Sequence, residues 1–282
     1  MLTTDKFDIK ALLEKIKHGE IQLPDFQREW VWKDKQIKSL LESVIRGFPI
    51  NSILLLECDT NNLKFAHRSI EGAGVTDAAP QYLILDGQQR LTSLFGALFS
   101  EDPVNIAKGN KQYFYYVDMK KAIAAVQNSE TDEDMIISVD DKKKLKAKGK
   151  NWDLSTPEKE FAAGMFPLNK IFDSRKWLRV YERFHNDESA VDLTDTFNEE
   201  IIDKVSSYKF IAIKIDKDTP LEAVCKIFEK VNISGVVRAQ VTKPFAESTV
   251  SRIIALVEDA GERKSHSETF ISRFARVYTP IV

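Results

Sequence analysis

The sequence predicts a mixed α and β fold, because strand-like and helix-like segments alternate along the chain. Residues 81–85 are short, apolar and β-prone, and apolar side chains then recur at helical spacing over 91–98. A second strand is expected over 208–215, where apolar and polar residues alternate. Amphipathic helices are expected around these strands, so neither an all-α nor an all-β protein fits.

Local signals place the other elements. In the first half we expect a helix over 7–16, an extended segment over 21–24, a helix capped by Asp34 that ends before Gly47, and strands over 52–57, 64–66 and 112–117. In the second half we expect a helix around 177–184, a helix capped by Thr194 that continues to 205, a helix over 220–231 and a helical tail.

The composition changes between residues 118 and 150. An acidic cluster at 132–134 is followed, after one apolar patch, by six lysines between Lys142 and Lys150. Such a run is usually a solvated insertion or loop, and the alternative is an arm that contacts nucleic-acid phosphates. We expect the run from Lys142 to Lys150 to be a mobile, exposed segment.

The composition describes an ordinary soluble protein. The chain has 282 residues, 43% hydrophobic and 30% charged, and a formal net charge of −2. This charge argues against a uniformly basic nucleic-acid coat but allows a local basic cleft. Two distant cysteines, the charged N-terminus and the lack of a long apolar stretch predict a cytoplasmic protein with no membrane association.

The most informative motif is Asp86-Gly87-Gln88-Gln89-Arg90, at the turn from the expected strand to the expected helix. Free backbone N–H groups and the helix dipole make a helix N-terminus a ready anion site. Gly87 would let a ligand approach the backbone, and Arg90 offers a planar fork that matches phosphate oxygens. We expect Arg90 to be exposed, so that truncating it costs little stability. The alternative is a plain strand–helix connection in which Asp86 caps the helix.

A second cluster, residues 24–32, repeats the Gln-Arg pair as Gln27-Arg28. We predict that the two pairs lie within one side-chain length of each other and clamp one phosphate chain. Phe26, Trp30 and Trp32 surround the pair. These aromatic residues are more often hydrophobic anchors for a loop, and the alternative is a contact with a base or a modified DNA phosphate.

Four blocks of the chain, residues 23–32, 43–50, 84–94 and 226–236, together resemble the N-terminal domain of GmrSD-type, modification-dependent restriction enzymes. The resemblance implies an α+β, ParB/sulfiredoxin-like core with a mixed sheet and surrounding helices. It implies an NTP-binding domain over 1–244 that contains the charged insertion 118–150. Residues 245–282 would be a helical segment, the start of a truncated C-terminal region.

The resemblance also assigns roles to residues. The candidates for catalysis are Asp86, Gln88, Gln89 and Arg90, with a glutamine orienting the attacking water and Asp86 holding Mg²⁺. The candidates for phosphate binding are Gln27, Arg28, Gly87 and Thr92, and those for a supporting role are Phe228, Asn232 and Gly235.

We therefore expect a nucleotide-dependent sensor, an NTP hydrolase, of a restriction or phage-defence system that acts on foreign or modified DNA. The alternative is a non-catalytic DNA-binding module that uses the same arginines. No Walker-type phosphate loop occurs, and none of the four histidines has metal-ligand spacing. Nuclease activity is thus expected from a further domain or a partner chain, and the oligomeric state stays open.

Overall fold

The computed structural model describes residues 2–59, 63–74, 77–106, 111–128, 135–147 and 150–233. The chain divides into two compact units, Met1–Lys217 and Asp218–Val282, which we describe separately. The expected helical tail over 245–282 lies outside the described residues, as does Gly235.

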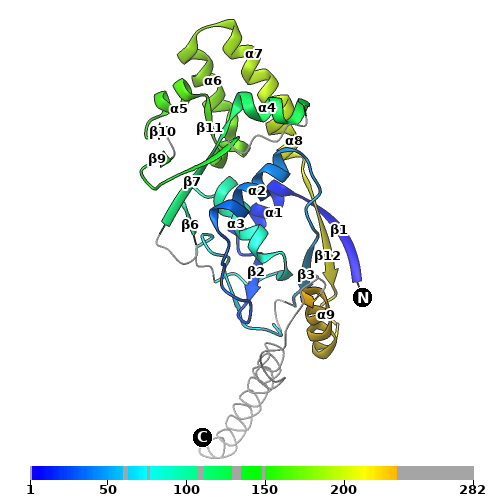
Figure 1. The fold of residues 1–282 in the computed structure, drawn as a ribbon. Coiled ribbons are helices and arrows are strands. Elements are labelled where there is room, and N and C mark those ends of the chain that lie inside the picture. Colours follow the sequence, from blue (N-terminus) through cyan, green and yellow to red (C-terminus); the bar gives the residue numbers. More distant parts are fainter. Residues whose placement is uncertain are drawn as a thin grey trace, which may run out of the picture. The chain divides into compact units, whose positions relative to one another are not determined.

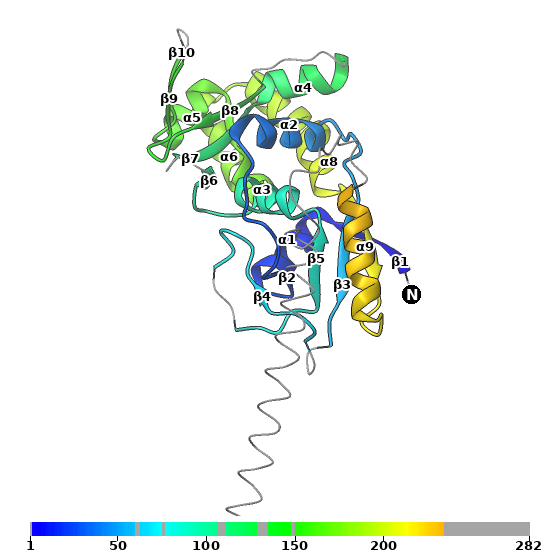
Figure 2. The same ribbon diagram turned by 60° about the horizontal axis from the view of Figure 1, so that its bottom comes forward.

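A six-stranded mixed sheet forms one side of the first unit (Figures 1 and 2). Its order is β1 (Leu2–Asp8), β12 (Lys209–Ile215), β3 (Ile53–Glu57), β5 (Tyr82–Asp86), β2 (Ile21–Pro24) and β4 (His67–Arg68). β12 pairs with β3 and β2 with β5 in parallel, whereas the other three pairings are antiparallel. The mixed sheet and its helices confirm the predicted α+β class, and ParB/sulfiredoxin-like topology stays a prediction.

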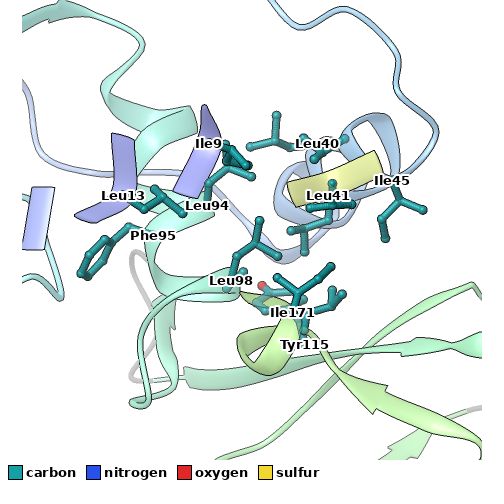
Figure 3. Packing of buried hydrophobic residues seen from close by; sticks show 14 of the residues in the cluster. Ile9, Leu13, Leu40, Leu41, Ile45, Leu94, Phe95, Leu98, Tyr115 and Ile171 are labelled. Atoms are coloured by element: carbon teal, nitrogen blue, oxygen red, sulfur yellow. The ribbon is translucent and has the colours of Figure 1, made fainter. Parts of the chain in front are cut away.

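Three helices build the core beside this sheet: α1 (Ile9–Lys17), α2 (Asp34–Ile45) and α3 (Gln88–Leu98). Figure 3 shows how Leu13, Leu41 and Leu94 pack together, one from each helix, and all three are fully buried. Burial of such side chains is the main favourable term in folding. The packing fixes the start of α3 against the ends of β3 and β5.

The rest of the first unit gathers at the other end in both views (Figures 1 and 2). Here β7 (Lys111–Asp118) pairs with three strands, β6 (Val104–Ile106), β8 (Ile136–Val139) and β11 (Met165–Pro167). The helical segments are α4 (Met119–Asn128), α5 (Pro157–Ala163), a 3-10 turn over Leu168–Asp173, α6 (Ser174–His185), α7 (Glu188–Phe197), a π-helical turn over Asn198–Ile202 and α8 (Asp203–Ser206).

The segment 118–150 is not a loop throughout. α4 and β8 lie inside this segment, and Met119, Ala122 and Val139 are fully buried. The described lysines of the run lie in or beside a two-stranded hairpin of β9 (Lys144–Ala147) and β10 (Lys150–Asp153), where Lys142, Lys144 and Lys146 are exposed, as expected. The charge runs flank these apolar patches and mask their periodicity in the sequence.

Three local predictions also need correction. Phe7 lies in β1 rather than in a helix. The sequence does not reveal this strand, because β1 is an exposed edge strand with no alternating apolar pattern. Asp34 is the first residue of α2, and the cap is Lys33, whose N–H donates to Gln36 Oε1 at 3.0 Å. Thr194 lies within α7, which Asp187 caps by accepting the Ala190 N–H at 2.7 Å.

The strand expected over 64–66 forms two residues later, as β4. In the second unit, α9 (Leu221–Ile233) confirms the predicted helix over 220–231 and contains Phe228 and Asn232. Among the described residues, no helix is both long and apolar enough to cross a lipid bilayer.

Candidate functional site

The turn between β5 and α3 depends on Gly87. Its φ is +97°, a left-handed conformation that favours glycine, and a Cβ here would lie 2.7 Å from Ile53 Cγ2. A contact this short cannot form without a shift of β3. Glycine is therefore required by the packing of the protein itself, whether or not a ligand also approaches.

The Asp86 carboxylate does not cap α3. Its Oδ2 accepts a hydrogen bond from Arg90 Nη2 at 3.2 Å, and no α3 backbone N–H donates to it within the described part of the chain. The capping alternative is therefore wrong. The first N–H groups of α3 have no partner within the helix, as helix geometry dictates, and such groups are the usual donors to a bound anion.

The expectation that Arg90 is exposed is also wrong, because only 14% of its side chain is accessible. Its guanidinium donates to the backbone oxygens of Asn51 and Ser52, the latter at 3.1 Å. Burial lowers the pKa of Arg90, and the Asp86 charge opposes that effect. Arg90 thus holds the segment before β3 onto the motif.

Tyr208, which no sequence motif marks, holds the same segment. Its hydroxyl donates to the Phe48 backbone oxygen at 2.8 Å and accepts from the Ile50 N–H at 3.0 Å. Burial raises the pKa of Tyr208, and the positive charge of Arg90 acts in the opposite direction. Residue 208 is about 160 positions from these partners, so no local pattern could reveal the contact.

The two motif glutamines are buried and hold the loop between β2 and α2, residues 25–33, which we call the Gln-Arg loop. Gln88 Nε2 donates to the Arg28 backbone oxygen at 2.8 Å. Gln89 Nε2 donates to the Glu29 backbone oxygen at 3.2 Å, and its Oε1 accepts from the Val31 N–H at 2.9 Å. Both amides are thus committed to this loop, and their role in orienting a water stays a prediction.

Two further side chains hold the Gln-Arg loop from the sheet. Gln27 Nε2 donates to the backbone oxygens of Leu85 and Ile84, at 2.8 and 3.2 Å. Arg68 of β4 approaches the backbone oxygens of Gln27 and Arg28, at 3.4 and 3.5 Å. These contacts confirm that the two Gln-Arg pairs adjoin. Arg68 was missed because it lies outside both motifs.

Arg28 differs from all these residues. Its backbone is held, but its side chain is exposed and makes no hydrogen bond or ion pair in the structure. A guanidinium on a restrained backbone retains all its donors for an external acceptor such as phosphate.

The aromatic residues of the Gln-Arg loop serve mainly as anchors. Phe26 packs edge-on against Phe65 with ring centroids 5.2 Å apart, and Trp32 packs against the core. Trp30 is 7% exposed, and its buried Nε1–H has no acceptor. Contact of these three residues with modified DNA stays a prediction.

Thr92 lies one turn beyond the glutamines and is buried. Its hydroxyl is 3.5 Å from Glu71 Oε2, and Glu71 also pairs with Arg68 at 3.1 Å. Thr92, Glu71 and Trp30 line a cavity of about 650 Å³. No group of three or more acidic, histidine or cysteine side chains that could hold a metal ion occurs among the described residues.

Comparison with known proteins identifies the family. Residues 9–240 match the GmrSD restriction endonuclease N-terminal domain. The chain belongs to this family. The match covers both Gln-Arg pairs, so the predicted resemblance is confirmed. Membership implies a part in a restriction or phage-defence system.

Individual relatives add less. The chain is 28% identical over 250 residues to an uncharacterized protein of Methanocaldococcus jannaschii. The match covers 83% of this chain but only 40% of that protein. The chain is also 46% identical over 52 residues to a zinc-transporting ATPase of Synechocystis, and 48% to a cadmium, zinc and cobalt-transporting ATPase of Bacillus subtilis. Each of these two matches covers 18% of this chain and 7% of the ATPase, too little to carry a function.

Proposed function

We propose that this chain is the nucleotide-dependent sensor domain of a restriction or phage-defence system, and that it binds and hydrolyses a nucleoside triphosphate. One observation carries the proposal: Arg28 presents an unpaired, exposed guanidinium from a backbone that Gln88 holds at the start of α3. The family match supports the defence context.

The chemistry follows from the two kinds of donor that meet here. The Arg28 guanidinium and the open N–H groups at the start of α3 would bind the phosphates by charge-assisted hydrogen bonds. Arg90 would act indirectly, because its donors already hold Asn51, Ser52 and Asp86. Gln88 is bound to the Gln-Arg loop through Nε2 alone, so its Oε1 would be the group that orients a water, whereas Gln89 could do so only after releasing the loop.

Magnesium fits this arrangement with Asp86 as its protein ligand. Mg²⁺ in phosphate sites commonly keeps several waters and needs only one or two carboxylates besides the phosphates. Asp86 Oδ2 pairs with Arg90, whereas its Oδ1 accepts no hydrogen bond. Bound Mg²⁺ would neutralise phosphate charge, and chelation with EDTA is expected to abolish hydrolysis.

The test compares Arg28→Ala with Arg179→Ala, an exposed arginine of α6 that makes no hydrogen bond or ion pair. Titration calorimetry with each NTP is expected to show at least a tenfold loss of affinity for Arg28→Ala, because charged hydrogen bonds contribute about 1.5–3 kcal/mol. Arg179→Ala should bind like the wild type. Equal affinity of both variants would contradict the proposal.

DNA is the expected partner of the same domain, and a nuclease domain or partner chain is expected to cut it. Binding of a DNA duplex by the wild type without any NTP binding, lost in Arg28→Ala, would favour the non-catalytic DNA-binding module instead. The salt dependence of that binding would report how many phosphates the protein contacts.

A further inference from the structure

The cavity beside α3 is a feature that the proposed phosphate chemistry leaves unexplained. At about 650 Å³ it falls within the range of small-molecule sites. It lies between the Gln-Arg loop, one face of α3, and the strands β6 and β7. Gly96 of α3 permits this arrangement, because a Cβ there would lie 2.9 Å from Val104 Cγ2 of β6.

The residues described around the cavity do not favour phosphate binding. Glu29, Glu71 and Asp102 contribute three carboxylates, and no basic side chain is among the described residues that line it. The side chains of Glu29 and Asp102 make no hydrogen bond or ion pair of their own. A ligand for this cavity must therefore offer hydrogen-bond donors, such as sugar hydroxyls or an exocyclic amine.

The ligand must also offer an apolar face, and an acceptor on it would give the Trp30 Nε1–H a partner once the indole ring turned toward the cavity. Trp30 contributes an aromatic wall, and its buried Nε1–H has no acceptor in the protein. An unpaired buried donor is costly, and an acceptor supplied by a ligand would remove that cost. A nucleoside combines all three properties: ring acceptors, donors on the base or ribose, and a flat face. Carboxylates are established partners of ribose hydroxyls and exocyclic amines.

The cavity and the proposed phosphate site are contiguous along two segments. Arg28, Glu29 and Trp30 follow one another on the Gln-Arg loop, and Gln88 and Gln89 hold their backbone. Along α3, Thr92 lies about 6 Å in axial rise beyond Gln88 on the same face. The charges of the two parts are opposite, which would orient a nucleotide with its phosphates at Arg28.

We propose that this cavity binds the nucleoside moiety of the nucleotide whose phosphates Arg28 holds. The inference rests on the proposed function and extends it. Glu29 and Asp102 would accept hydrogen bonds from the ribose or base, Trp30 Nε1 would donate to a base acceptor, and Thr92 would meet the nucleoside rather than a phosphate.

The experiment separates the nucleoside from the phosphates by comparing each NTP with inorganic triphosphate. Trp30→Phe removes the unpaired donor and keeps an aromatic wall, while Glu29→Gln is an exposed, nearly isosteric change. Both variants are expected to bind NTPs about tenfold more weakly and inorganic triphosphate as tightly as the wild type. The matched controls are Trp152→Phe on β10 and Glu101→Gln, an exposed acid outside the cavity lining.

The outcomes are distinct. Unchanged NTP affinity in both variants, with triphosphate still bound, would overturn the inference and leave the proposed function standing. Failure of the wild type to bind either NTP or triphosphate would refute the proposed function itself. A loss of affinity confined to a single-stranded oligonucleotide would show that the nucleoside comes from DNA, and would also overturn the inference. Glu29→Gln decides the test if Trp30→Phe does not fold.

Discussion

The two Gln-Arg pairs have the same sequence but opposite environments. In the Gln-Arg loop, Gln27 is bound to the backbone of β5, while Arg28 is exposed and unpaired. At the start of α3, both Gln89 and Arg90 are bound to neighbouring loops. One pair thus leaves its arginine available to a ligand, and the other is part of the scaffold that holds the first in place.

This difference shows that residue type alone does not distinguish a ligand-binding arginine from a structural one. Arg90 lies between the segment before β3 and the Asp86 carboxylate. Its donors are therefore bound to oxygen atoms of the protein itself. Arg28 lies on a loop whose carbonyls are already occupied by Gln88 and Arg68. The distinction depends on contacts between segments far apart in the chain.

The largest expected effect is on stability, and it tests the contrast between Arg90 and Arg28. Arg90→Ala is expected to lower the free energy of unfolding by about 3 kcal/mol, because it leaves the backbone oxygens of Asn51 and Ser52 and the half-buried Asp86 carboxylate without this donor. Arg28→Ala should change the free energy of unfolding by no more than about 0.5 kcal/mol. Urea unfolding of the two variants measures the difference. Similar losses for both would mean that the two arginines share one role.

Gly87→Ala is expected to cost about 2 kcal/mol, because alanine would be strained at a φ of +97° and would contact Ile53. If packing is the reason, Ile53→Ala should relieve part of the cost. A double-mutant cycle then gives a favourable coupling of about 1 kcal/mol between the two positions. Strict additivity would indicate that only the backbone conformation, and not the contact, requires glycine.

Gln89→Ala is expected to destabilise the protein by about 1–2 kcal/mol, since it removes two hydrogen bonds to the Gln-Arg loop and leaves the Val31 N–H unpaired. It should also weaken NTP binding, because the loop that carries Arg28 would lose its anchors at Glu29 and Val31. Gln127→Ala, on an exposed position of α4, is the control. Normal NTP affinity in a destabilised Gln89→Ala protein would separate loop anchoring from ligand binding.

The sequence allowed the strand, turn and helix around Asp86 to be predicted, because apolar periodicity and a turn dipeptide are local signals. It also allowed the adjacency of the two Gln-Arg pairs to be predicted from their shared chemistry. It could not show which groups were occupied, because Arg68 and Tyr208 reach their partners across 40 and 160 residues. The edge strand β1 and the buried patches near Met119 were hidden by exposed or charged neighbours.

The smallest expected effect concerns alkaline pH and again distinguishes the two regions. Tyr208 holds the same segment as Arg90, and burial raises its pKa above the ordinary value of 10.0. Above about pH 10 the unfolded chain loses this proton while the folded protein keeps it, so the free energy of unfolding decreases as pH rises. Ionisation would also remove the hydrogen bond from Tyr208 to the Phe48 backbone oxygen.

Tyr208→Phe isolates this contribution from those of Cys58 and Tyr116, whose pKa values burial also raises. The variant should be less stable than the wild type at pH 7, because the Ile50 N–H loses its acceptor. Its urea midpoint should then decrease less steeply above pH 10. Arg28→Ala should follow the wild-type pH curve, since Arg28 interacts with no group that titrates there. If Tyr208→Phe kept the wild-type slope, ionisation of Tyr208 would have no part in alkaline unfolding, and only its hydrogen bonds would connect it to the Arg90 region.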